Sequence, residues 1–527
     1  MKLYESGIYY PATQGTGARG SITERTTALA YIAFTAFLVH FVVNSMAVYG
    51  IFRDELYYIA CSGHLDWGYV DQPPLAAMLL AMSRFMFGDS LVTLRLFPAI
   101  AHSGTVLLAG LMARELGGNR YAQVLAAVAT IIPGVYLGNF TYFSMNAFDI
   151  LIWAIIFYTV IKIIKYENTK LWLLFGLVVG IGLENKLSVM FLCFGLVVGM
   201  LLTSQRRHFL SGWFWLGGLV AAILFLPHVL WQVDNGWPTL EFMRNATMNK
   251  NMPVAPVEFF IGQVLELHPF NVLIWVPGLL YFLFSSKGGR YRLFALAYIA
   301  IFIVFAVQNG KPYYQSPFYS VLFAAGGVVI GESTARKGQR WLRAVLLVLL
   351  VAGGAILAPV AIPVLPVESY IRYAAAIGVE PTSGERDKPG KLPQHFADMF
   401  GWEEMAATVA GVYRELSPEE QSKCAIFGQN YGQAGAIDFF GKAYGLPDAI
   451  SGHNNYWIWG PGDRDIEVVI IIGGNEEDHD SFFEECSIRA VHRNEYARSF
   501  ETNLNIYVCK GLKRPLSETW PMMRHYN

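Results

Sequence analysis

Charged residues are scarce in this chain. Of its 527 residues, 15% are Asp, Glu, Lys or Arg, whereas 54% are hydrophobic. A soluble protein of this size carries about a quarter charged residues, because its surface must face water. The shortage excludes an ordinary soluble enzyme, and we expect much of the surface to face lipid.

Cysteine is also rare. The five cysteines fit no metal-ligand spacing and are too few for a disulfide framework; they are Cys61, Cys193, Cys424, Cys486 and Cys509. Cys486 and Cys509 can pair if the C-terminal region lies on an oxidising side, but spacing alone does not decide this. Residues 1–27 lack the apolar core of a cleavable signal, so we expect a cytoplasmic N-terminal segment. The formal net charge is −1, and no nucleic acid is expected as a partner.

Long apolar runs fill the first two-thirds of the sequence. A bilayer core about 30 Å thick needs roughly 20 apolar residues per helix, and backbone groups in hydrocarbon must be paired internally. The runs predict a polytopic α-helical membrane domain over residues 28–365 with eleven transmembrane helices, near 28–50, 91–113, 121–138, 147–164, 171–183, 187–203, 212–232, 267–284, 291–308, 314–331 and 341–363.

Basic residues indicate the orientation of these helices. Lys and Arg cluster in alternate loops, around 114–120, 162–170, 206–207, 287–292 and 336–343, and such loops face the cytoplasm. The other loops, above all 51–90 and 233–266, then face outward. Within the first of these, an amphipathic piece at 75–87 is expected to lie in the membrane interface.

The last third of the chain has ordinary globular composition. A helical pattern at 400–416 and apolar runs at 424–428, 466–472 and 504–509 predict a soluble α/β domain over residues 366–527, outside the cytoplasm. Residues 380–393 are typical of an exposed loop. The glycine-rich run 428–435 lacks the spacing of a nucleotide-binding loop.

Polar residues at membrane depth converge on the predicted outer side. Taken singly, each has a simple explanation: Asp54 and Glu55 as a solvated helix end, Asp149 as a partner for Arg95, Lys186 as an interfacial anchor. Their accumulation on one side favours a shared polar cavity, because ionisable groups near hydrocarbon are costly unless paired or hydrated. The candidate residues are Asp54, Glu55, Asp71, Gln72, Arg95, Asn146, Asp149, Lys186, Lys311, Tyr313 and Tyr314.

Four short motifs carry a family resemblance. They are Asp54-Glu55-Leu56-Tyr57-Tyr58-Ile59-Ala60, Gln72-Pro73-Pro74-Leu75, Arg95-Leu96-Phe97-Pro98 and Lys311-Pro312-Tyr313-Tyr314. In this order, the motifs resemble the bacterial branch of family 39 in the GT-C superfamily of glycosyltransferases. That branch is related to protein O-mannosyltransferases and to the aminoarabinose transferases that modify lipid A. The likeness covers residues 28–335.

The resemblance implies a reaction and roles for individual residues. It implies an inverting transfer of a mannose-like sugar from a polyprenyl-phosphate lipid to an acceptor at the outer face of a bacterial cytoplasmic membrane. By analogy, Asp54 is the general base and Glu55 tunes or positions it. Lys311, with Tyr313 and Tyr314, is the first choice for binding the donor phosphate. Arg95 and Lys186 are second choices.

The sequence departs from the family in two places. Asn146 stands where related sequences carry an acidic residue, and Asp149, one turn later, can substitute for it. Asp71-Gln72 stands where aminoarabinose transferases have Glu-Lys, so a lysine contact to the lipid phosphate is missing. The donor sugar or the acceptor can therefore differ from theirs.

Other functions stay open at this level. A lipid-linked sugar flippase would show polar residues near the bilayer midplane and internal repeats, which the sequence does not favour. A polysaccharide ligase with a polyprenyl-diphosphate donor would also work at the outer face. The acceptor is unknown, no cofactor is implied with certainty, and a divalent cation is left open.

Overall fold

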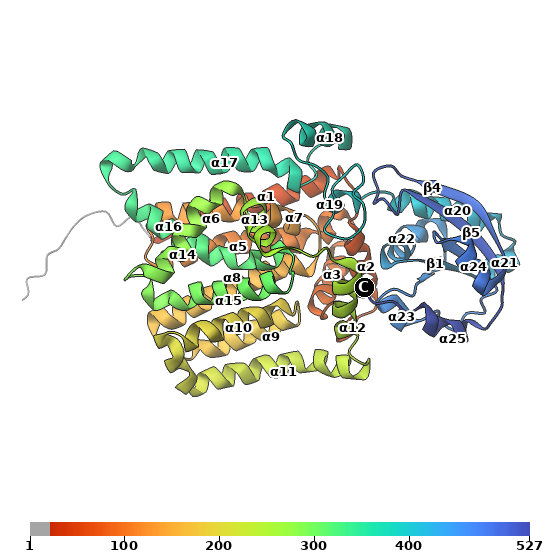
Figure 1. The fold of residues 1–527 in the computed structure, drawn as a ribbon, viewed down its shortest axis with the longest axis horizontal. Helices are drawn as coiled ribbons and strands as arrows, with labels where there is room; N and C mark the ends of the chain where they lie inside the picture. Colours follow the sequence, from red (N-terminus) through yellow and green to blue (C-terminus); the bar gives the residue numbers. More distant parts are fainter. Residues whose placement is uncertain (1–21) are drawn as a thin grey trace, which may run out of the picture.

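The protein is a bundle of long helices with a smaller domain at one end. The computed structural model describes residues 22–527, and Figure 1 shows the C-terminal domain beside the bundle end that carries α2, α3 and α12. Most of the expected N-terminal segment, 1–27, lies outside the described residues. This arrangement confirms a polytopic helical protein with a C-terminal α/β domain.

Each of the eleven expected membrane runs contains a helix. They correspond to α1 (Ile22–Met46), α5 (Leu96–Glu115), α6 (Arg120–Ile131) with α7 (Gly134–Thr141), α8 (Met145–Tyr166), α9 (Leu171–Leu183), α10 (Ser188–Leu201), α11 (Gly212–Asp234), α14 (Val272–Phe284), α15 (Arg292–Val307), α16 (Tyr319–Ser333) and α17 (Trp341–Ala361).

Not all of these helices are full-length straight spans. Within the described residues, six are long and apolar enough to cross a membrane alone, and the number rises to nine if each of three bent pairs is one span. α6 and α7 meet at 63° around Pro133, which has no N–H to continue the helix. The other two of the eleven, α9 and α16, have 13 and 15 residues, and α16 is preceded by the 3₁₀ helix η5 (Pro312–Phe318).

Small residues let neighbouring helices approach closely. In α14, a Cβ at Gly278 would lie 2.1 Å from the carbonyl oxygen of Leu322 in α16. A Cβ at Gly326 in α16 would lie 1.9 Å from the carbonyl oxygen of Ile274. Close packing of this kind is a main source of helix association in membranes, where no hydrophobic driving force acts between helices.

Short elements cover the end of the bundle that faces the C-terminal domain. The helix predicted at 75–87 is present as α3 (Leu75–Phe87), and its Phe85 is 93% exposed. The other elements here are α2 (Arg53–Gly63), α4 (Leu91–Leu94), α12 (Pro238–Asn245) and the π-helix η2 (Ala246–Lys250). By contrast, α13 (Pro256–Glu266) and η3 (Pro269–Asn271), part of which was expected in the loop 233–266, lie among the long helices, where His268 faces Gly353 of α17.

The C-terminal domain is built on a five-stranded sheet of order β2-β1-β3-β5-β4. β1 pairs in parallel with β2 and β3, whereas β5 runs antiparallel to β3 and β4. The strands are β1 (Cys424–Gly428), β2 (Ala449–Ile450), β3 (Val468–Ile472), β4 (Phe483–Arg493) and β5 (Asn503–Leu512).

Helices and short turns complete this domain. The pattern at 400–416 is present as α20, and the apolar runs of the sequence are present as β1, β3 and β5. The helices are α20 (Trp402–Glu415), α21 (Pro418–Ser422), α22 (Tyr431–Phe440), α23 (Asn455–Trp459), α24 (Glu476–Phe482) and α25 (Leu516–Thr519). Before them, α18 (Val367–Ala376) and α19 (Gln394–Ala397) pack on the end of the bundle, in one apolar cluster with Tyr49 and Phe52.

One disulfide joins neighbouring strands. Cys486 of β4 and Cys509 of β5 lie opposite each other in the ladder and are bonded, which settles the pairing that spacing left open. The strand β4 escaped sequence analysis because it lies at the sheet edge, where its side chains are mostly exposed or half-buried and charged residues interrupt the apolar pattern.

The two parts of the protein share one buried core. A single cluster of buried apolar side chains runs from the helix bundle through Leu56 of α2 to Tyr431 and Ile437 of α22, and on to Ile470 of β3. The C-terminal domain therefore rests directly on α2.

Candidate functional site

The two adjacent acidic residues lie in the first turn of α2. The Glu55 carboxylate accepts a hydrogen bond from the N–H of Phe52, the N-cap residue, at 2.9 Å and so closes this turn. Negative charge near a helix N-terminus is favoured by the helix dipole. Glu55 is 1% exposed, whereas Asp54 is only partly buried, so the two neighbours in sequence face different surroundings.

Glu55 is held in a closed ion pair with Arg95. Arg95 donates from Nε to Oε1 at 2.8 Å and from Nη2 to Oε2 at 2.7 Å, and the Phe143 N–H donates to Oε1 at 2.7 Å. Arg95 is 1% exposed, and its Nη2 also donates to the carbonyl oxygen of Gly50. This arrangement ties α5 to α2. It gives no support to Arg95 as a ligand for the donor phosphate, and it makes Glu55, not Asp149, the partner of Arg95.

Asp54 turns toward the C-terminal domain. Its Oδ1 accepts a hydrogen bond from the hydroxyl of Tyr431, the first residue of α22, at 2.8 Å. No second hydrogen bond reaches this carboxylate from residues 22–527, so Oδ2 is left without a protein donor. A carboxylate with one fixed and one free oxygen is well suited to accept a proton.

A second polar cluster brings together five of the predicted residues. The Lys186 ammonium donates to Asn146 Oδ1 at 2.6 Å and lies 3.9 Å from the Asp149 carboxylate. It also lies over the rings of Tyr313 and Tyr314, at 5.7 and 5.6 Å from their centroids. The structure therefore brings Asn146, Asp149, Lys186 and both tyrosines together at one place, although they come from three separate parts of the sequence.

Lys311 lies next to this cluster, just before η5. Its ammonium group makes no hydrogen bond or ion pair with the part of the chain that the structure describes. Burial lowers the pKa of Lys311, and the carboxylates of Glu385 and Asp54 act in the opposite direction. Lys311 and Asp54 are thus within electrostatic reach of each other at the same end of the bundle.

Asp71 and Gln72 lie in the turn that precedes α3. Burial, and secondarily the negative charge of Asp54, raise the pKa of Asp71 to about 7. Gln72 is 1% exposed, and its Nε2 lies 3.8 Å from Cys61 Sγ. Asp71 therefore belongs to the surroundings of Asp54, whereas Gln72 packs inside the protein.

A group of ion pairs around Arg498, which sequence analysis missed, lies at the same end of the bundle as Asp54; below it is called the Arg498 clasp. Arg498 is buried and contacts three carboxylates, with distances of 2.8 Å to Glu385, 2.7 Å to Asp387 and 3.6 Å to Asp398. Lys250, the last residue of η2 in the 233–266 loop, lies 3.8 Å from Glu385. Burial acts to raise the pKa of Glu385, but the charges of Lys250 and Arg498 lower it to about 2. The predicted loop 380–393 is therefore held by ion pairs to the 233–266 loop on one side and to Arg498 on the other.

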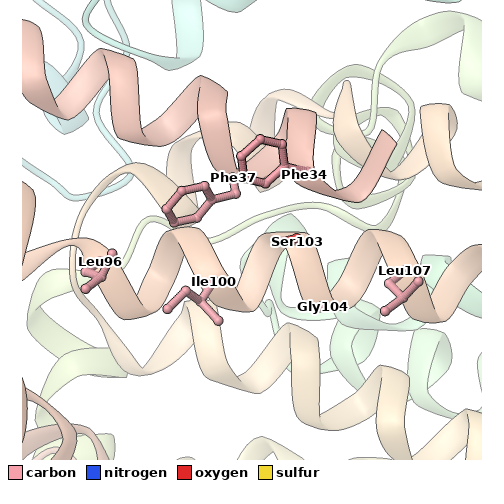
Figure 2. A pocket seen from close by; sticks show the side chains of 7 residues that line it. All are labelled: Phe34, Phe37, Leu96, Ile100, Ser103, Gly104 and Leu107. Atoms are coloured by element: carbon pink, nitrogen blue, oxygen red, sulfur yellow. The ribbon is translucent and has the colours of Figure 1, made fainter. Parts of the chain in front are cut away.

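Metal ligands do not gather at this site. Among residues 22–527, no group of three or more His, Cys, Asp or Glu side chains is arranged to hold a metal ion. A separate apolar groove lies between α1 and α5, where Figure 2 shows Phe34 and Phe37 facing Leu96 and Ile100. Its lining carries no charged side chain, so it has no part in the polar site.

Comparisons with known proteins agree on one kind of protein. Residues 71–231 match the family described as dolichyl-phosphate-mannose-protein mannosyltransferase. The resemblance to family 39 is confirmed. A lipid A galacturonosyltransferase, RgtD of Rhizobium johnstonii, is 24% identical over 260 residues, which are 48% of this chain and 54% of the relative. The chain thus matches only about half the length of that curated relative.

Solved structures support the fold. ArnT from Cupriavidus metallidurans, bound to undecaprenyl phosphate, superposes with a TM-score of 0.61 at 12% identity and covers 93% of this chain and 98% of its own. The arabinofuranosyltransferase AftD from Mycobacteria gives a TM-score of 0.53 at 12% identity over 93% of this chain and 40% of its own. The chain therefore has the fold of these two membrane enzymes.

Proposed function

We propose that this chain is an inverting glycosyltransferase that moves a mannose-like sugar from a polyprenyl-phosphate donor to an acceptor hydroxyl. The observation that carries this proposal is the presence, at one end of the bundle, of a carboxylate with a free oxygen and an unpaired ammonium group, those of Asp54 and Lys311. A relative that binds undecaprenyl phosphate and another named for transferring galacturonic acid to lipid A support the choice of substrates.

Asp54 acts as the general base. The acceptor hydroxyl loses its proton to Oδ2 of Asp54 while its oxygen forms a bond to the anomeric carbon. The bond between that carbon and the phosphate oxygen breaks, and the electron pair leaves with the polyprenyl phosphate. Attack from the side opposite the leaving group inverts the anomeric centre. No nucleotide is needed, because the phosphate ester already activates the sugar.

Cations on the same end receive the phosphate. Lys311 is the first candidate, because its ammonium is not paired within the described chain. Lys186 is the second, since Asn146 and Asp149 hold its ammonium beside the two tyrosine rings. A fixed positive charge stabilises the extra charge that develops on a departing phosphate, and it does so most strongly where water is excluded.

We also propose that the site faces the outside of a bacterial cytoplasmic membrane. The disulfide between Cys486 and Cys509 favours an oxidising compartment for the C-terminal domain, because thiols are kept reduced in the cytosol. The basic loops at the other ends of the helices favour a cytoplasmic position there. In this proposal residues 28–365 form the transferase domain and 366–527 the extracytoplasmic domain.

The test is transfer by the purified protein in detergent or liposomes. Polyprenyl-phosphate mannose is the first donor, and donors carrying galacturonic acid or aminoarabinose are compared with it, using lipid, saccharide and peptide acceptors. Asp54→Asn is expected to lower the rate at least about 100-fold, the usual scale for loss of a general base, while binding of polyprenyl phosphate is retained. The matched control is Asp89→Asn, an exposed carboxylate in the same outer loop that pairs with Arg84.

Two results would contradict the proposal. Transfer at the wild-type rate by Asp54→Asn would remove Asp54 as the base. Movement of the intact lipid-linked sugar across liposomes without transfer to any acceptor would indicate the flippase alternative instead.

A further inference from the structure

The C-terminal domain contacts the candidate catalytic helix through α22. A Cβ at Gly432 would lie 2.7 Å from Cγ of Arg53, and one at Gly435 would lie 3.0 Å from the backbone of Leu56. The glycine-rich run 428–435, which does not have the spacing of a nucleotide loop, therefore serves to bring the α22 backbone onto α2. Close approach of this kind is a common reason for glycine in a helix contact.

This contact fixes one side chain against Asp54. The Tyr431 ring stacks on Tyr57 of α2, with the ring centroids 4.7 Å apart. The guanidinium of Arg53, also in α2, lies 4.9 Å from the centroid of the Tyr431 ring. His453 packs against the ring at 4.6 Å. Tyr431 is only 6% exposed, and these three neighbours hold its ring in place. In this position its hydroxyl donates a hydrogen bond to Asp54 Oδ1 at 2.8 Å.

The hydroxyl of Tyr431 acts as the hydrogen-bond donor to Asp54. Burial, and then the negative charge of Asp54, raise the pKa of this phenol well above its usual value. It therefore keeps its proton across the physiological range. A hydrogen bond from a neutral donor to a carboxylate is charge-assisted and stronger than one between neutral groups.

We propose that Tyr431 is a positioning residue for Asp54, so that the C-terminal domain completes the catalytic site of the membrane domain. The bond to Oδ1 sets the rotation of the carboxylate and leaves Oδ2 directed to the acceptor hydroxyl. Activity then depends on docking of the two domains, although Tyr431 itself touches no reacting atom. This inference rests on the proposed function, since it assigns a partner to the proposed base.

The test compares two tyrosines that differ in their partner. Tyr431→Phe removes the hydroxyl and keeps the stacked ring. The control is Tyr456→Phe, because Tyr456 is also buried and donates to a carboxylate, that of Asp438, at 2.6 Å within the same domain. We expect Tyr431→Phe to lower kcat roughly tenfold with KM for donor and acceptor little changed. Tyr456→Phe is expected to keep kcat near that of the wild type.

Melting temperatures of both variants separate folding from catalysis. If Tyr431→Phe and Tyr456→Phe have the same kcat in an assay where the wild type transfers sugar and Asp54→Asn does not, the positioning role is wrong and the proposed function stands. If Tyr431→Phe raises KM and leaves kcat unchanged, the hydroxyl binds substrate and the positioning role is again wrong. A wild-type protein that transfers no sugar from any donor would instead contradict the proposed function.

Discussion

Two neighbouring carboxylates on α2 lie in opposite environments. Around Glu55, a buried arginine and two backbone N–H groups supply every hydrogen bond that the carboxylate can readily accept. Around Asp54, a single phenol from another domain supplies one bond and leaves an oxygen open. Under the proposed function the acidic pair divides its roles: Glu55 holds the helix in place, and Asp54 is left accessible to act as the base.

The largest expected effect comes from breaking the ion pair between Glu55 and Arg95. Glu55→Gln leaves the buried Arg95 charge without its counterion, and loss of one partner from such a pair costs about 3–5 kcal/mol. We expect a strongly lowered melting temperature in detergent, followed by circular dichroism, and low expression. Glu403→Gln, on an exposed first-turn residue of α20, is the control and should melt like the wild type. Equal melting of the two variants would show that the ion pair does not hold α2.

A smaller effect is expected from disturbing the contact between α22 and α2 that places Tyr431 against Asp54. Gly432→Ala forces a methyl group to within 2.7 Å of Arg53 Cγ, and overpacking of this kind costs about 1–3 kcal/mol. Because α22 must shift, Tyr431 moves away from Asp54, so we expect the transfer rate to fall even where the protein stays folded. In Gly411→Ala, the control, the new methyl group meets nothing within 4 Å on an exposed face of α20. A rate that is unchanged in Gly432→Ala would mean that docking of α22 does not matter.

Much of the fold could be predicted from the sequence, but the partners of the site residues could not. The apolar runs predicted a helix at each of eleven positions, because a helix that crosses hydrocarbon needs an apolar run of a set length, but they missed α13, which was expected in a loop. The limits of α3 and β1 followed from proline, glycine and strand patterns. By contrast, nothing near Tyr431 in the sequence indicates that it meets Asp54, which lies 377 positions away.

The roles of the two arginines show the same limit. Arg95 was a reasonable candidate for phosphate binding because it precedes a membrane helix and lies near other polar residues in the sequence. In the structure its guanidinium is instead paired with the carboxylate of Glu55. Arg498, the centre of the clasp, stands alone in a polar loop and gives no signal at all. A single charged residue carries no information about its partner unless the fold is known.

The last prediction concerns Asp71, a buried carboxyl near Asp54, whose substitution is expected to have no effect on stability near pH 4. Its pKa is raised from 3.8 to about 7 by burial and by the charge of Asp54. Between about pH 4 and pH 7 the folded protein therefore keeps a proton that the unfolded chain has released. Stability from this group is fully present below about pH 4 and is lost as the pH rises to about 7. Asp71→Asn removes that loss.

We accordingly expect Asp71→Asn to melt like the wild type near pH 4 and to become progressively more stable than the wild type up to pH 7. The measurement is the melting temperature of both proteins across that range in one detergent. Asp480→Asn, in an exposed position of the C-terminal domain, controls for loss of a carboxylate and should show a constant difference. Combining Asp71→Asn with Asp54→Asn sharpens the comparison, because without the Asp54 charge the gain should shrink. If the gain in stability is the same with and without the Asp54 charge, burial alone raises the pKa of Asp71, and the two carboxyl groups do not interact.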